Sequence, residues 1–286
     1  MPIEGEHFYE DYTPGAGSLF RINKLIFEGR TRLQEVLIFE NELFGKVLVL
    51  DGIVQTTTSD EFIYHEMLTH VPVLAHGNVE NILIVGGGDG GTLRQALTHS
   101  GAEATMVDID PELVQLCREH IPEIGRGGFD DPRATVVAGD GFEFVKSVAE
   151  EFDVIICDTT DPLGGPGDVL YSQPFFEACR SKLRNGGVLV IQSGVPHHER
   201  GRIRKLRKAL GSVFRDMTVY TASVPSYFGG VMTIGWGCDD PNIRRVPLAD
   251  IEQRFEDSRI DTKYYTPDIH LSSFALPQYL RDLIEG

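Results

Sequence analysis

A carboxylate lies inside a glycine turn that follows an apolar run in residues 82–95. A strand that ends in glycines and opens a helix brings backbone N–H groups and a helix N-terminus close to a ligand, which suits phosphate or carboxylate. Asp89 reverses that preference, because its negative charge would repel an anion and attract an ammonium. The turn, which begins at Gly86, therefore favours a nucleoside that carries positive charge. The alternative is that Asp89 only caps the following helix.

Further acids follow apolar runs at the spacing that nucleoside binding requires. Asp108 comes about 20 residues after the glycine turn, where an acidic side chain hydrogen-bonds the ribose hydroxyls in doubly wound sheets. Asp110 precedes Pro111 and is explained as a helix N-cap. Asp140 follows the run 135–138, where it could accept a hydrogen bond from an adenine amino group. Asp89, Asp108 and Asp140, which follow three successive strands, together predict an adenosyl site.

The next apolar run, 154–157, ends in Asp158, and Asp161 follows in a loop rich in glycine and proline. Its length and β-branched content predict a buried parallel strand, so Asp158 should emerge where open α/β sheets bind ligands. The alternative is that both acids cap turns through Asx hydrogen bonds. Together with Asp89 and Asp108 these acids would repel one another strongly, so we expect the ligands to be cations.

The chain resembles, almost end to end, the spermidine synthase family of polyamine aminopropyltransferases, which use decarboxylated S-adenosylmethionine. The segments that carry the resemblance are residues 34–41, 50–57, 60–67, 86–91, 158–162, 225–230 and 274–277. The resemblance implies transfer of an aminopropyl group to a primary amine, with putrescine as the expected acceptor and spermidine and methylthioadenosine as products. The donor is a co-substrate, so no cofactor is expected.

Site roles follow from the same resemblance. It implies that Asp158 is the general base and that Asp161, Tyr64, Tyr227 and Gln192 bind the amine. The residues implied to hold the adenosyl substrate are Gln34, Gln55, His65, Gly86, Asp89, Asp108, Asp140 and Gly141.

Four positions depart from the family pattern. Asp108 replaces the more usual Glu, which shortens the reach to the ribose but keeps the charge. Gln95 replaces a Glu, and Ser193 stands where a Gly is frequent. The pair Gly164–Gly165 makes the loop beside the amine site one residue longer, and this could alter which diamine fits.

Composition and cysteine content indicate an acidic protein, and no metal is expected. With 26 Lys and Arg against 43 Asp and Glu, the net charge is −17, which argues against binding to nucleic acid or to an anionic membrane. The four cysteines form no Cys-x-x-Cys pair, so neither a zinc site nor a disulfide framework is expected. His65 and His70 would lie on different faces of a helix, unlike the histidines of a zincin motif.

The N-terminus lacks an apolar signal segment, and no apolar run is long enough to span a bilayer. The expected location is cytoplasmic.

The elements that must position these residues divide near residue 59. Short β-rich runs and turns in 25–57 predict hairpins, so residues 1–58 are expected to form a small N-terminal β domain. Residues 59–286 begin with a helix over 60–75 and continue as alternating strands and helices. This alternation predicts a Rossmann-like, methyltransferase-type parallel sheet with helices on both faces, ending in a hairpin that flanks Tyr227. A homodimer or homotetramer is expected, with the edges of the β domain as a plausible contact.

Two other functions would use a similar sheet or bind a similar ligand. A small-molecule methyltransferase would share the sheet, but Asp89 would clash with the carboxylate of intact S-adenosylmethionine. A non-enzymatic polyamine-binding protein would need to have lost the base or the amine contacts, and these are present.

The basic segment 200–210 places its apolar residues on one helical face, which indicates a solvated helix rather than a nucleic-acid patch.

Overall fold

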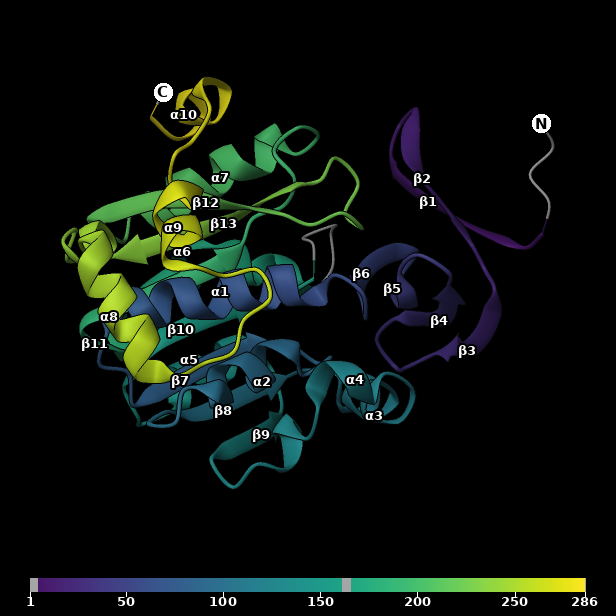
Figure 1. Cartoon of the computed structure of the whole chain (residues 1–286), viewed down its shortest axis with the longest axis horizontal. Helices are drawn as coiled ribbons and strands as arrows, with labels where there is room; N and C mark the ends of the chain where they lie inside the picture. Colours follow the sequence, from purple (N-terminus) through teal and green to yellow (C-terminus); the bar gives the residue numbers. More distant parts are fainter. Residues whose placement is uncertain (1–4, 161–165, 286) are drawn as a thin grey trace.

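The computed structural model describes residues 5–160 and 166–285 and places two β units before an α/β unit (Figure 1). The N-terminal strands form a two-stranded hairpin, β1–β2, and a four-stranded antiparallel sheet in the order β3-β4-β5-β6. Their bounds are β1 His7–Thr13, β2 Ala16–Arg21, β3 Lys24–Arg30, β4 Glu35–Asn41, β5 Gly45–Leu50 and β6 Ile53–Thr57. The hairpins predicted within 25–57 are confirmed, and β1–β2 is an addition that the apolar pattern did not reveal.

The four-stranded sheet buries side chains on both of its faces. Val36 and Ile38 of β4 pack with residues of helices α3 and α4 in the α/β unit. Phe39, next along the same strand, packs on the opposite face against Phe20 of the hairpin. Because successive side chains of a strand point to opposite faces, one short sheet joins the hairpin to the rest of the chain.

A seven-stranded sheet with the order β12-β13-β11-β10-β7-β8-β9 forms the centre of the α/β unit. Strands β11, β10, β7, β8 and β9 run parallel, and β13 is antiparallel to both β11 and β12. Their bounds are β7 Asn81–Gly86, β8 Glu103–Asp108, β9 Ala134–Ala138, β10 Phe152–Asp158, β11 Leu183–Gln192, β12 Asp216–Ser223 and β13 Val231–Cys238. The predicted fold class, including the terminal hairpin, is confirmed.

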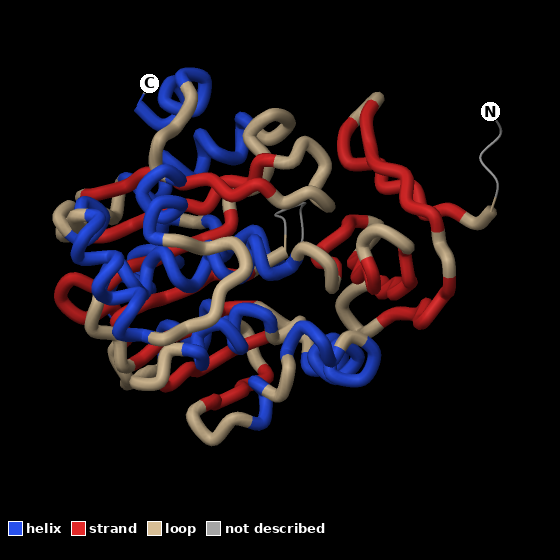
Figure 2. The backbone as a smooth tube through the Cα atoms, viewed as in Figure 1, coloured by secondary structure: helices blue, strands red, loops and turns tan. Residues whose placement is uncertain are grey.

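Helices cover both faces of this sheet (Figure 2). Alternate residues of β10 point to opposite sides: Ile156 packs in one cluster with α1 and α2, and Ile155 packs in another with α5, α6 and α7. The helices are α1 Glu61–His76, α2 Gly91–Thr98, α3 Pro111–His120, α4 Pro122–Gly125, α5 Gly141–Ser147, α6 Gln173–Lys182, α7 Arg200–Gly211, α8 Leu248–Ser258, α9 Pro267–Ser273 and α10 Gln278–Glu285, with 3-10 turns η1 Gly128–Asp130, η2 Pro166–Tyr171 and η3 Ile243–Arg245. Within the described ranges, no helix has the length and apolar character to cross a membrane.

The basic helix α7 is mostly as the sequence predicts. Ile203 and Leu206 are buried, and most of its cations lie at the surface. Arg202 differs, because its guanidinium bonds Glu199 and the hydroxyl of Tyr171. This cation is held by Glu199 and by Tyr171 of η2 and is not on the solvated face.

A buried carboxylate ties the C-terminal part of the chain to α1. Glu66 accepts backbone N–H groups from Lys263, Tyr264 and Tyr265 at 2.8–2.9 Å. We expect Glu66→Gln to lower the free energy of unfolding by about 1–3 kcal/mol, because an amide offers one acceptor and turns its N–H₂ group toward another donor. Denaturant titration measures the change, and Glu252→Gln on exposed α8 is the control with almost no effect. Equal stability of the two variants would contradict this role for Glu66.

Candidate active site

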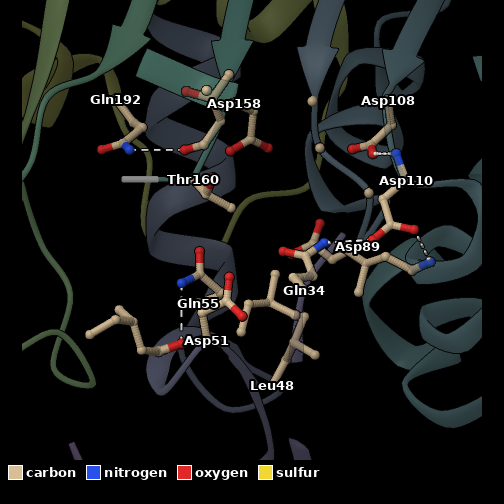
Figure 3. Close-up of a pocket in the computed structure, with 18 of the residues that line it drawn as sticks. Gln34, Leu48, Asp51, Gln55, Asp89, Asp108, Asp110, Asp158, Thr160 and Gln192 are labelled. Carbon is tan, nitrogen blue, oxygen red and sulfur yellow. Dashed lines mark hydrogen bonds between the residues drawn. The ribbon is translucent and has the colours of Figure 1, made fainter. Parts of the chain in front are cut away.

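A cavity of about 500 Å³ lies where the carboxyl ends of β7, β8 and β10 face the four-stranded sheet. Figure 3 shows Asp108 and Asp158 at two strand ends, with Gln55 on the other side of the cavity. Every predicted site residue within the described ranges lines it: Gln34, Gln55, Tyr64, His65, Gly86, Asp89, Asp108, Asp140, Gly141, Asp158, Gln192 and Tyr227. Asp161 and the longer Gly164–Gly165 loop lie outside the described residues.

Asp158 is the last residue of β10, and hydrogen bonds orient both of its carboxylate oxygens. Oδ1 accepts the hydroxyl of Tyr64 at 2.7 Å, and Oδ2 accepts that of Thr92 at 2.5 Å. Burial raises the pKa of Asp158, the charge of His65 opposes the rise, and the charge of Asp89 adds to it. The result is a carboxylate that is held in one orientation and is more basic than an exposed aspartate.

The glycine turn after β7 brings backbone close to Asp158. Gly86 and Gly87 have φ of 87° and 77°, which L side chains rarely adopt. The N–H of Gly87 donates to the backbone oxygen of Asp158 at 2.8 Å, and a Cβ at Gly86 would collide with that oxygen. Glycine is therefore required for β7 and β10 to meet at the cavity wall.

Asp89 holds the start of α2 and also lines the cavity. Its Oδ1 accepts the N–H of Gly91 at the start of α2 at 2.8 Å, as in an Asx turn. Its Oδ2 lies 3.4 Å from Nε2 of His65 and lines the cavity. The carboxylate is thus fixed by the helix start while one edge faces the site.

A chain of charges behind the cavity escaped the sequence interpretation. Glu61 accepts Nδ1 of His65 at 2.7 Å, and Arg94 bonds the same carboxylate through two nitrogens at 2.8 and 2.9 Å. The order of groups is therefore Arg94, Glu61, His65 and Asp89. Glu61 and His65 are four residues apart on α1, a spacing that brings side chains together, and this spacing was the available signal.

The charges of this chain shift the pKa values of its members strongly. Burial alone would lower the pKa of His65, but Asp89 and Glu61 raise it to about 10. Burial would raise the pKa of Glu61, but His65 and Arg94 lower it to about 2. His65 is therefore a cation at neutral pH. The protein therefore places one positive charge of its own among these acids, which the sequence interpretation did not foresee.

His65, Asp89 and Asp158 form the one group of potential metal ligands within 4.8 Å of one another in the described part of the chain. A metal needs a free imidazole lone pair. Nδ1 of His65 is hydrogen-bonded to Glu61, and Nε2 lies 3.4 Å from Asp89, so both nitrogens already have anionic partners. The cluster in this state fits an ion-pair network better than a metal.

Three acids at the end of the cavity near β8 and β9 also accept backbone N–H groups. Asp108 ends β8 and accepts the N–H of Asp110 at 2.8 Å; burial raises its pKa to about 6. Asp110 is the N-cap of α3, as predicted, and it also accepts the amide of Gln34 at 2.8 Å. Asp140 caps α5 through Oδ1, which leaves Oδ2 for a ligand.

The other end of the cavity is built from side chains that bond main-chain atoms. Gln192, on β11, donates to the carbonyl of Thr159 at 2.9 Å. The hydroxyl of Tyr227 donates to the carbonyl of Gln55 at 2.8 Å. This bond joins the loop between β12 and β13 to the four-stranded sheet. Glu10 lines this part and accepts the N–H of Val54 at 2.9 Å. It comes from β1, for which the sequence offered no signal.

The raised pKa of His65 predicts a pH dependence of stability. A group with a higher pKa in the folded state stabilises the fold fully below its unfolded pKa of about 6.5, and this contribution is lost as pH rises through about 10. We expect the difference in unfolding free energy between the unmodified protein and His65→Gln to shrink across this window, by up to about 1.4 kcal/mol per pH unit. For His76→Gln, at the far end of α1, the difference should stay flat. A flat difference for His65→Gln as well would show that His65 is neutral.

The fold and site define a Rossmann-like protein with an acidic cavity at the edge of the sheet. Residues 61–247 match the spermine/spermidine synthase domain, and residues 7–58 match the spermidine synthase tetramerisation domain. The chain therefore belongs to the spermine/spermidine synthase family, and it is an enzyme of the polyamine aminopropyltransferase class.

Individual relatives span nearly all of the chain. It is 49% identical to polyamine aminopropyltransferase 1 of Pseudomonas aeruginosa over 97% of both chains, and 45% identical to the enzyme of Pectobacterium carotovorum over 98% of both. The chain is also similar to a spermidine synthase whose crystal structure contains the transition state analogue AdoDATO. The two sequences are 34% identical, and the structures superpose with a TM-score of 0.93 over 100% of this chain and 97% of that one. The spermidine synthase of Thermotoga maritima is 33% identical, with a TM-score of 0.90 over 100% and 96%.

Proposed function

We propose that this enzyme transfers the aminopropyl group of decarboxylated S-adenosylmethionine to putrescine and releases spermidine and methylthioadenosine. The observation that carries the proposal is the carboxylate of Asp158, held by Tyr64 and Thr92 at a strand end inside an acidic cavity. Similarity to a spermidine synthase that binds the analogue AdoDATO supports it.

The proposed reaction needs orientation and proton removal more than covalent chemistry. The amine nitrogen attacks the propyl carbon, a C–N bond forms, and the C–S bond to the sulfonium breaks. The nucleophile must be a neutral amine, so a base has to take its proton before or during attack. Asp158 is the proposed base, and the leaving group departs as neutral methylthioadenosine.

The difference in pKa between base and amine sets what the site must supply. An alkylammonium has a pKa of about 10.4 and an aspartate about 3.9, which corresponds to roughly 9 kcal/mol in water. Burial and the charge of Asp89 raise the pKa of Asp158, while the positive charge of the sulfonium lowers that of the neighbouring ammonium. Both changes narrow the difference.

The division of the cavity between the two substrates follows the family resemblance. We assign the amine to Tyr64, Tyr227, Gln192 and Asp161. We assign the adenosyl donor to Gln34, Gln55, His65, Gly86, Asp89, Asp108, Asp140 and Gly141. The donor is a co-substrate, and the proposal needs no cofactor. The match of residues 7–58 to a tetramerisation domain supports a homo-oligomer.

Competition among amines tests the acceptor. The enzyme receives the donor with equal amounts of putrescine, cadaverine, agmatine and spermidine, and mass spectrometry separates the products. We expect new spermidine to dominate. A larger yield from another amine would overturn putrescine as the preferred acceptor and leave aminopropyl transfer intact.

A further inference from the structure

Both ring nitrogens of His65 lie beside carboxylates. Nδ1 lies 2.7 Å from Glu61, and Nε2 lies 3.4 Å from Asp89. An ionised carboxylate accepts hydrogen bonds and cannot donate them, so Nδ1 carries a proton. The negative charges of Asp89 and Glu61 raise the pKa of His65 to about 10 and keep a second proton on Nε2. The ring is therefore an imidazolium inside the site that we assign to the donor.

The two protons of His65 are held unequally. Glu61 makes the shorter contact and is itself fixed by two nitrogens of Arg94, which keeps this carboxylate charged. Asp89 is farther from the ring and shares its other oxygen with the N–H of Gly91. The proton on Nε2, the nitrogen that faces the cavity, is the one that can leave.

The groups around His65 show what a cationic ligand would meet. The titratable and charged groups that face it are Glu61 and Tyr64 from α1, Asp89 from the glycine turn, Asp158 from β10 and, through Glu61, Arg94 from α2. Single ligand atoms of His65, Asp89 and Asp158 lie within 4.8 Å of one another. Decarboxylated S-adenosylmethionine adds a sulfonium and an ammonium to this volume. The imidazolium and the donor therefore compete for the carboxylates of Asp89 and Asp158.

We propose that His65 releases its Nε2 proton when the donor binds, and that Glu61 is a positioning residue that keeps the other proton on Nδ1. The exchange turns Nε2 from a hydrogen-bond donor into an acceptor that faces the ammonium of the donor. The proton leaves to solvent, and a fixed cation of the protein is replaced by a cation of the substrate. This inference rests on the proposed function.

The exchange makes donor binding depend on pH in a defined direction. Binding that releases a proton strengthens as pH rises, by up to about tenfold in affinity per pH unit, until His65 is already neutral in the free enzyme at about pH 10. Methylthioadenosine carries neither charge, so its affinity should change little over the same range.

Calorimetric titration at about pH 8 in buffers of different ionisation enthalpy, such as phosphate and Tris, counts the released protons. We expect about one proton per donor bound and none per methylthioadenosine. His65→Gln should abolish the release. Glu61→Gln should reduce it, because His65 without its charged partner is partly neutral before binding. His76→Gln, which changes a histidine on the same helix outside the cavity, should release as many protons as the unmodified protein.

A second measurement covers the case in which a variant does not fold. In unmodified protein labelled with ¹⁵N-histidine, the Nε2 signal of one ring should move from the protonated to the unprotonated position on addition of the donor. Donor binding without proton release, or the same release from His65→Gln, would overturn the exchange. Failure of the proposed function is distinct, since the donor would then neither bind nor react.

Discussion

Replacing Asp158 with Asn is expected to lower turnover at neutral pH by about 100-fold or more, the scale of a general base. The change removes the proton acceptor and retains the shape of the side chain. Asn can still accept the hydroxyl of Tyr64, and the hydroxyl of Thr92 can rotate to accept from its amide. Steady-state assays of methylthioadenosine release measure the loss, and we expect donor binding by calorimetry to persist.

Alkaline pH provides the internal control for this variant. Because solution supplies more neutral amine as pH approaches about 10.4, Asp158→Asn should recover part of its deficit relative to the unmodified enzyme. A variant that is merely misfolded would show no such recovery. Near-native turnover of Asp158→Asn at neutral pH would mean that another group removes the proton.

Replacing Asp89 with Asn should change which adenosyl compound binds. The decarboxylated donor ends in a bare ammonium, whereas intact S-adenosylmethionine adds a carboxylate that would lie beside Asp89. Like charges placed together in a partly desolvated site cost several kcal/mol. We expect Asp89→Asn to bind the donor about 10–100-fold more weakly, the value of one charged contact, and to bind the intact compound relatively better.

Asp140→Asn is the matched control for this selectivity, because it removes another carboxylate from the same cavity. We assign Asp140 to the adenine, which both compounds share, so the control should weaken both equally. Calorimetric titration of both ligands into all three proteins supplies the ratios. Should Asp89→Asn also weaken both equally, Asp89 would be a helix-start residue and selectivity would arise elsewhere.

The sequence predicts the sheet because each buried strand is marked by its own apolar run, which can be recognised without knowledge of distant contacts. The run 154–157 is buried on both faces, and Asp158 comes directly after it at the edge of the sheet. Residues at the ends of parallel strands meet without any further information about packing. This rule suffices to bring Asp89, Asp108 and Asp158 to one cavity.

Contacts between distant elements could not be derived in the same way. The hairpin β1–β2 places Glu10 in the cavity wall. No pattern in the sequence indicates that this hairpin lies near the strand ends that carry Asp89, Asp108 and Asp158. The ion pair of Glu61 with Arg94 depends on how α1 packs on α2. This pair is part of the network that keeps His65 cationic, and the sequence interpretation did not include that positive charge.

The most direct test of aminopropyl transfer supplies the enzyme and putrescine with either decarboxylated or intact S-adenosylmethionine and identifies the nucleoside product by mass spectrometry. We predict methylthioadenosine and spermidine in equal amounts from the decarboxylated compound, and no S-adenosylhomocysteine from the intact one. S-adenosylhomocysteine together with a methylated amine would instead identify a methyltransferase and contradict the proposed function.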